Sequence, residues 1–238
     1  MALILSLETS TTICSAALHD EGNLLVAKEI HIPQSASSQL APIIHDLLNH
    51  SGITSRQINA VAVASGPGSY TGLRIGVSMA KGLCFALQIP LIAINTLELL
   101  AYQVNHSFRN TSPSPLERGA GGEVLLCPML DARRMEVYCL LADHDLNIVE
   151  PTQAKIIDVD SFKKWLHANT ILFFGNGADK CRANIKQSNA IFIDGINPSA
   201  SKLGEMAFLK FKSRKFEDLL SFEPLYLKEF LIKKPKTV

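Results

Sequence analysis

The stretch 65-SGPGSYTGLRIGVSMAKGLCFAL-87 decides the fold. It follows the apolar run 58–64 (INAVAVA), which has the length and the boundaries of a buried strand. The Gly-Pro-Gly segment at 66–68 predicts a turn, because proline fixes φ and glycine tolerates positive φ. Ser69 or Thr71 can then cap a helix of about four turns. Together with the strands and helices expected before and after it, which follow one another as βββαβαβα, this stretch favours an α/β protein.

The predicted helix carries apolar surface over roughly 200° of its circumference, whereas a helix resting on one sheet needs only about 100°. Arg74 and Lys81 belong to a narrow polar stripe. Gly72, Gly76 and Ala80, at four-residue spacing, would let a second backbone come close. Two interpretations stay open: the helix packs on its own sheet and on a helix of another chain, or it is buried within its own subunit. On the first interpretation, the partner interface contains Tyr70, Gly72, Leu73, Gly76, Val77, Met79, Ala80 and Leu83.

Several catalytic motifs do not match this sequence. The glycines near 66–76 fit neither the G-x-x-x-x-G-K-[ST] phosphate loop nor the G-x-G-x-x-G dinucleotide fingerprint. Ser69 is not centred in a G-x-S-x-G nucleophile elbow. His45 and His50 are five residues apart and lie on different faces of a predicted helix, so they form no H-x-x-x-H metal pair. We therefore expect no catalytic residue and no metal ligand in this chain.

Composition points to a cytoplasmic protein with a sizeable core. The 238 residues are 47% hydrophobic, and 23 basic residues against 22 acidic ones give a net charge of +1. This balance argues against a large basic field that could hold a nucleic acid alone. No apolar run reaches the ~18–20 residues of a membrane span. The five cysteines contain no C-x-x-C pair and mostly lie in apolar runs, which favours reduced core thiols.

Periodicity divides the chain into four parts. We expect an N-terminal lobe over 1–105, an insertion loop rich in Pro, Ser and Gly over 106–123, a C-terminal lobe over 124–222 and a tail over 223–238. The expected strands are 2–7, 13–19, 24–32, 58–64, 90–94, 124–130, 135–142, 155–159, 171–174 and 190–193. The expected helices, besides the one after 68, are 40–50, 97–104, 161–168 and 199–215, the last of which could pack back on the first lobe.

A family resemblance is carried by five motifs. They are LSLETST (5–11), INAVAVASG (58–66), GPGSYTGLRIGVSMAKGL (66–83), DARRMEVY (131–138) and EPLYLKEF (223–230). Together they resemble the TsaB (YeaZ) family of the glycoprotease and sugar-kinase (ASKHA) superfamily, densely over roughly residues 1–100 and weakly between the later motifs. The resemblance implies an ASKHA fold with two pseudo-duplicated βββαβα lobes.

The same resemblance marks two loops as vestigial nucleotide loops. Glu8, Thr9 and Ser10 stand where active ASKHA proteins place an aspartate and small hydroxyls against phosphate and metal, and the longer Glu8 side chain weakens that role. Asp131 would be the acid of the second lobe, with Gly175 and Gly177 near the adenosine. The alternative is that these residues only complete tight turns. No cofactor is firmly expected, and weak binding of ATP or ADP stays open.

The resemblance implies a non-catalytic subunit that binds and activates TsaD, the transferase that moves threonylcarbamoyl onto the adenosine beside the anticodon of tRNA. The partners would then be TsaD, in a heterodimer, and TsaE, with a homodimer when the chain is alone. Contact with tRNA would be only indirect, through the complex, and no membrane is involved. The alternatives are an active ATP-dependent transferase or kinase of the ASKHA fold and, more remotely, a peptidase.

Overall fold

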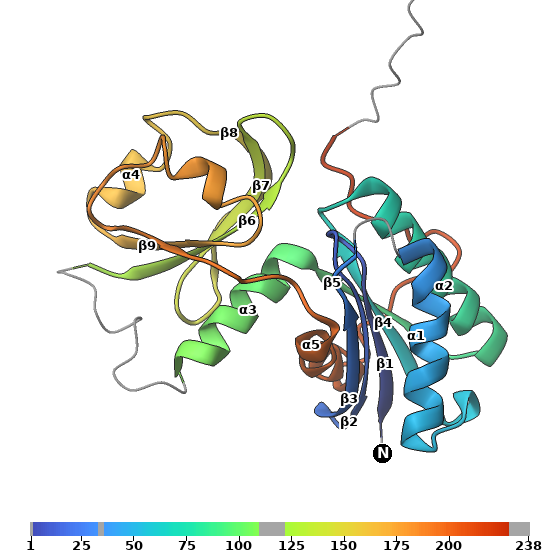
Figure 1. Ribbon diagram of the computed structural model, residues 1–238. Coiled ribbons are helices and arrows are strands. Elements are labelled where there is room, and N and C mark those ends of the chain that lie inside the picture. Colours follow the sequence, from blue (N-terminus) through green and yellow to red (C-terminus); the bar gives the residue numbers. More distant parts are fainter. Residues whose placement is uncertain (1, 33–35, 110–121, 229–238) are drawn as a thin grey trace, which may run out of the picture.

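The computed structural model describes residues 2–32, 36–109 and 122–228, which form two lobes (Figure 1). Each lobe contains a mixed five-stranded sheet, and the strand orders are β3-β2-β1-β4-β5 and β8-β7-β6-β9-β10. In both lobes three antiparallel strands are followed by two parallel ones in the same positions. The predicted α/β class and the duplicated two-lobe fold are therefore confirmed.

The first lobe is close to its predicted outline. Its strands are β1 (Leu3–Glu8), β2 (Cys14–Asp20), β3 (Asn23–Ile30), β4 (Ala60–Gly66) and β5 (Leu91–Asn95). Its helices are α1 (Ala36–Ser51), the 3-10 turn η1 (Ser55–Gln57), α2 (Tyr70–Leu87) and α3 (Thr96–Arg109). Because α3 continues to Arg109, the first four residues of the loop expected at 106–123 are helical, and 110–121 lie outside the described residues.

The second lobe repeats the strands but shortens the helices. Its strands are β6 (Val124–Asp131), β7 (Glu136–Ala142), β8 (Ile148–Ile156), β9 (Thr170–Phe174) and β10 (Ala190–Ile193). Its helical elements are α4 (Lys163–Leu166), the 3-10 turn η3 (Asp179–Cys181) and α5 (Ala200–Lys212). The helix expected at 161–168 is thus only four residues long.

The position of β8 differs from the predicted strand at 155–159. This edge strand carries exposed and half-exposed side chains and contains Pro151, so it shows no apolar run. Proline is tolerated there because an edge strand needs fewer ladder hydrogen bonds. Only residues 155 and 156 of the expected strand belong to β8.

The lobes exchange helices across their boundary. Helices α1 and α2 pack on one face of the first sheet, through a core that includes Leu5, Val63 and Val77. The other face is covered by α5, which comes from the second lobe and packs Leu203 among residues of β1, β4 and β5. Conversely, α3 packs Leu100 on the second sheet. Figure 1 shows α3 and α5 between the two sheets. Each sheet thus needs a helix that follows the other sheet in sequence.

The β strands alternate in the way this layering requires. Leu3, Leu5 and Leu7 of β1 point to the α1–α2 side, and Ile4 points to the α5 side. All six residues of β1 are buried, as expected for a strand covered on both faces. Among the residues described, none of the helices has the length and apolar character required to cross a membrane.

Two helix glycines predict opposite effects on stability. A Cβ at Gly204 of α5 would lie 2.0 Å from Nδ1 of the buried His19, whereas nothing lies within 4 Å of a Cβ at Gly82 of α2. We expect Gly204→Ala to lower the free energy of unfolding by about 1–3 kcal/mol through overpacking. Gly82→Ala should raise it by about 0.5–1 kcal/mol, since alanine favours helix. Urea unfolding of both variants checks this, and equal effects of the two would contradict the packing of α5.

Candidate functional site

The orientation of α2 is set by a close contact with the turn between β1 and β2. Ser69 caps the helix and accepts a hydrogen bond from the amide of Gly72 at 3.3 Å. A Cβ at Gly72 would lie 2.0 Å from the carbonyl oxygen of Thr9, and one at Gly76 would lie 2.3 Å from Thr9 Oγ1. That hydroxyl donates to the carbonyl of Gly72 at 2.7 Å. The glycine face of α2 therefore lies against the chain's own first hairpin.

This contact corrects the expected interface. Five of its eight residues are buried inside the first lobe, because they face the sheet and the Thr9 turn: Gly72, Leu73, Gly76, Val77 and Ala80. The other three, Tyr70, Met79 and Leu83, are half-buried and reach the opposite side of the helix. The glycines of α2 thus allow another segment to come close, as predicted, but that segment is the Thr9 turn of the same chain.

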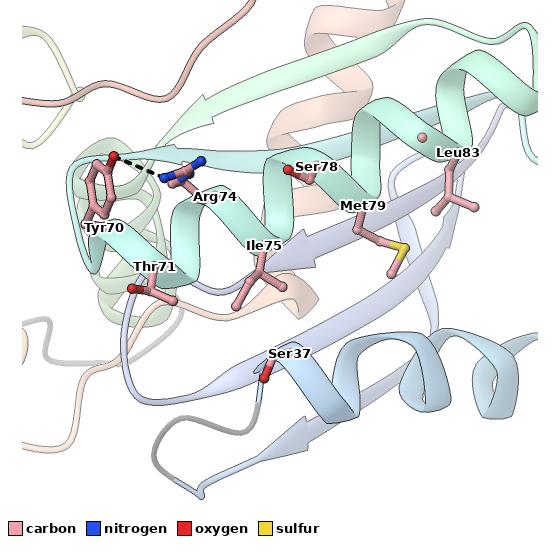
Figure 2. Close-up of a pocket in the computed structure, with 9 residues that line it drawn as sticks. Ser37, Tyr70, Thr71, Arg74, Ile75, Ser78, Met79 and Leu83 are labelled. Carbon is pink, nitrogen blue, oxygen red and sulfur yellow. Dashed lines mark hydrogen bonds between the residues drawn. The ribbon is translucent and has the colours of Figure 1, made fainter.

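The outer face of α2 borders a groove toward α1 with a volume of about 690 Å³ (Figure 2). It is lined by Ser37, Tyr70, Thr71, Arg74, Ile75, Ser78, Met79, Gly82 and Leu83. Ile75, Met79 and Leu83 supply apolar surface, and the Arg74 guanidinium donates to the Tyr70 hydroxyl at 3.3 Å. Phe85, on the same helix, is 76% exposed. An exposed apolar surface with a polar rim is typical of a protein interaction site.

The first of the two loops that the resemblance marks as vestigial, residues 8–10, is buried. Glu8 is fully buried, and its Oε1 accepts hydrogen bonds from the amide and the hydroxyl of Ser10, both at 2.5 Å. Its Oε2 has no partner among the described residues. Burial raises the pKa of Glu8 to about 7, against the lowering effect of the two Ser10 hydrogen bonds. Glu8 lies under the surface here, so it is poorly placed to hold a metal against phosphate.

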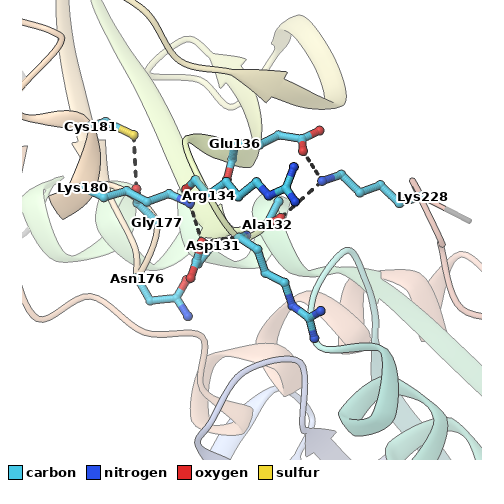
Figure 3. A network of polar contacts seen from close by, with 10 residues as sticks. Asp131, Ala132, Arg134, Glu136, Asn176, Gly177, Lys180, Cys181 and Lys228 are labelled. Carbon is cyan, nitrogen blue, oxygen red and sulfur yellow. Dashed lines mark hydrogen bonds and ion pairs between the residues drawn. The ribbon is translucent and has the colours of Figure 1, made fainter. Parts of the chain in front are cut away.

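The second loop is closed by ion pairing. Lys180 of η3 binds the carboxylate of Asp131, and the Asp131 amide donates to Oδ1 of Asn176 at 3.0 Å (Figure 3). A Cβ at Gly175 would lie 2.3 Å from the Met129 carbonyl oxygen, and one at Gly177 would lie 2.7 Å from the Leu130 carbonyl carbon. Close packing on β6 therefore requires glycine at both positions. The carboxylate of Asp131 is already paired with Lys180.

The two loops occupy equivalent places in the two lobes. Glu8 ends β1 and Asp131 ends β6, and each strand end is approached by glycines that follow a parallel strand. The structure brings Glu8, Thr9 and Ser10 together with α2, and Asp131 together with Gly175 and Gly177. No hydrogen bond in the described part of the chain joins one loop to the other. The same part contains no group of three or more His, Cys, Asp or Glu residues that could hold a metal.

The segment after α5 was only partly anticipated. It binds the first lobe through the Leu225 amide, which donates to the Ser65 carbonyl at 2.7 Å, and through Tyr226, whose ring lies 4.9 Å from that of Tyr70. Lys228 then reaches the second lobe and pairs with Glu136. The tail motif gave the only signal for these contacts, because an extended segment has no helical or strand periodicity. Residues 229–238 of the expected tail lie outside the described residues.

The raised pKa of Glu8 predicts a pH-dependent stability. Between about pH 4.5 and pH 7 the unfolded chain loses the Glu8 proton while the folded chain keeps it, so the free energy of unfolding falls as pH rises through this window. Glu8→Gln removes the effect. The stability difference, variant minus parent, should therefore increase by roughly 3 kcal/mol from pH 4.5 to pH 7.5. Urea titrations across this range measure it, and a difference that does not change with pH would contradict the burial of an ionisable Glu8.

Known proteins match the chain along nearly its whole length. The family model described as "TsaD: tRNA N6-adenosine threonylcarbamoyltransferase" matches residues 32–223. The tRNA threonylcarbamoyladenosine biosynthesis protein TsaB of Bacillus subtilis is 28% identical over 94% of this chain and 93% of its own length. TsaB of Escherichia coli is also 28% identical, over 94% of each chain. The solved structure of YeaZ from Pseudomonas aeruginosa has a TM-score of 0.77 at 26% identity and covers 95% of this chain and 100% of that one.

The motif resemblance is thereby confirmed at the level of whole chains. The family match covers both lobes, and the relatives that match end to end carry the name TsaB or YeaZ. The chain therefore belongs to the TsaD family and is similar over 94–95% of its length to proteins named TsaB or YeaZ.

Proposed function

We propose that this protein acts in tRNA threonylcarbamoyladenosine biosynthesis as a subunit that docks on a TsaD-type transferase through the α1–α2 groove. The pathway is the one named for the TsaB relatives. The observation that carries the docking role is the apolar outer face of α2, where Ile75, Met79 and Leu83 line an open groove beside α1. The glycine face of α2 is buried against the Thr9 turn of the same lobe, so the side that lines the groove is the part of α2 that a partner can reach.

A non-catalytic role is supported by both acidic loops. Glu8 is buried and keeps its proton up to about pH 7, and Asp131 is neutralised by Lys180. An active ATP-dependent enzyme of this fold would need such acids exposed to metal and phosphate. The alternative of an independent transferase or kinase therefore has less support than the partner role.

The same groove suits a second copy when the transferase is absent. A single self-complementary patch closes into a two-fold dimer without leaving further copies of it exposed. TsaD and a second copy would then compete for Met79 and Leu83, and TsaE would bind elsewhere on the complex. Contact of this chain with tRNA does not follow from the groove, because Arg74 is the one cation among its described lining residues.

Ser78→Arg tests the docking surface. Ser78 is exposed and lines the groove, so the longer charged side chain should obstruct a partner and leave the fold intact. We expect the affinity for the transferase, measured by calorimetry or size exclusion, to fall by about 2 kcal/mol or more, a roughly thirtyfold higher Kd. Ser107→Arg on α3 is the matched control, since Ser107 is an exposed helical serine outside the groove. Unchanged affinity of the Ser78 variant, or equal loss in both, would refute the assignment.

A further inference from the structure

The turn between β6 and β7 holds two adjacent arginines in left-handed conformations. Arg133 has φ +68° and Arg134 has φ +49°, and both side chains are exposed. For an L residue this conformation is costly, by roughly 1–2 kcal/mol each. Asparagine and glycine adopt it at lower cost, so the choice of two arginines at this place is unfavourable for folding alone. Such positions cluster at functional sites.

The turn is held in place by hydrogen bonds to every carbonyl from residue 132 to residue 136. Lys228 donates to the Ala132 carbonyl at 3.2 Å, and Lys180 donates to those of Arg134 and Glu136, both at 2.7 Å (Figure 3). The carbonyls of 133 and 135 accept from the amides of Glu136 and Ile157, at 3.2 and 2.7 Å. These bonds fix the backbone of the turn, so both arginine side chains start from defined points on the surface of the second lobe.

The charges around the turn do not cancel. Its two carboxylates are already paired, Asp131 with Lys180 and Glu136 with Lys228. Within the described residues, neither Arg133 nor Arg134 has a side-chain hydrogen bond or ion pair. The turn and the side chains bonded to it thus have a surplus of two positive charges. The cations are Arg133, Arg134, Lys180 and Lys228, and the anions are Asp131 and Glu136. That surplus exceeds the +1 of the entire chain.

We infer that the Arg133–Arg134 turn binds the phosphodiester backbone of RNA. Guanidinium groups match phosphate oxygens with paired hydrogen bonds and are easily desolvated. Two arginines on a fixed backbone, neither with a side-chain partner among the described residues, therefore suit two phosphates. The choice of RNA rests on the proposed function, in which the complex acts on tRNA. This site modifies the expectation from total charge: a near-neutral chain can still contact a nucleic acid at one small cationic turn.

The test is the affinity of the chain and of its complex with the transferase for an unmodified tRNA transcript, measured between 50 and 300 mM salt. We expect the double variant Arg133→Gln, Arg134→Gln to bind roughly 10- to 30-fold more weakly near 150 mM salt. The slope of log K against log salt should become shallower by about 1.5–2, as two lost phosphate contacts require. The control, Arg56→Gln with Lys186→Gln, removes the same charge from two exposed residues outside the turn and should leave the slope unchanged.

Two further variants separate binding from folding. Arg133→Lys with Arg134→Lys keeps the charge and should retain most of the salt slope. Arg133→Gly with Arg134→Gly relieves the left-handed strain, so its Tm should be equal to or above that of the parent while RNA affinity falls as in the Gln variant. A lower Tm with unchanged RNA affinity would mean that the arginines are structural, and would overturn the inference.

Other outcomes would overturn it in distinguishable ways. The Gln variant could lose affinity for the transferase, with RNA binding to the complex reduced only as much as the complex itself is. In that case the arginines face an acidic protein surface. If the Gln variant loses affinity for ATP and keeps that for RNA, the phosphate is that of a free nucleotide. Failure of the parent chain to associate with the transferase would refute the proposed function instead, and the titration of RNA on the isolated chain would still decide the role of the turn.

Discussion

The structure of the first lobe depends on the approach of Thr9 to α2, at a distance that leaves no room for a side chain. The Thr9 carbonyl and hydroxyl lie where the Cβ atoms of residues 72 and 76 would be, and the hydroxyl donates to the Gly72 carbonyl. Because this contact fixes the rotation of α2 about its axis, it also decides which residues remain outside. The apolar groove beside α1 is thus a consequence of a glycine contact on the opposite side of the helix.

The second lobe uses the same device with a different result. Gly175 and Gly177 pack on Met129 and Leu130 nearly as closely as the α2 glycines pack on Thr9. Here, however, a 3-10 turn replaces the long helix, and it presents Lys180 to the strand end in place of an apolar face. The two lobes therefore share close glycine packing at the strand end but differ in the surface beside it. This surface is apolar along α2 in the first lobe and cationic at the β6–β7 turn in the second.

Much of this architecture could be predicted from the sequence, because burial on both faces makes strands such as β1, β4 and β6 continuous apolar runs. The edge strand β8 could not, since half-exposed residues and Pro151 remove its pattern. Periodicity also placed Gly72 and Gly76 on one face of α2 correctly. It could not show which of two apolar faces meets the chain's own sheet, because that depends on the distant residue Thr9. The pairing of Asp131 with Lys180 was missed for the same reason: 49 positions separate them.

The groove and the arginine turn are connected by the segment that follows α5. Tyr226 packs on Tyr70 at one end of the groove, and Lys228, two positions later, binds both the Ala132 carbonyl and Glu136 at the base of the turn. A chain this short cannot follow two lobes that move apart, so separating them would break one of these contacts. The tail therefore adds a link between the two surfaces to the packing of α3 and α5 across the boundary of the lobes. A partner docked on the groove would then stand beside the same two lobes as the turn, so that an RNA bound by this partner would be within reach of the two arginines.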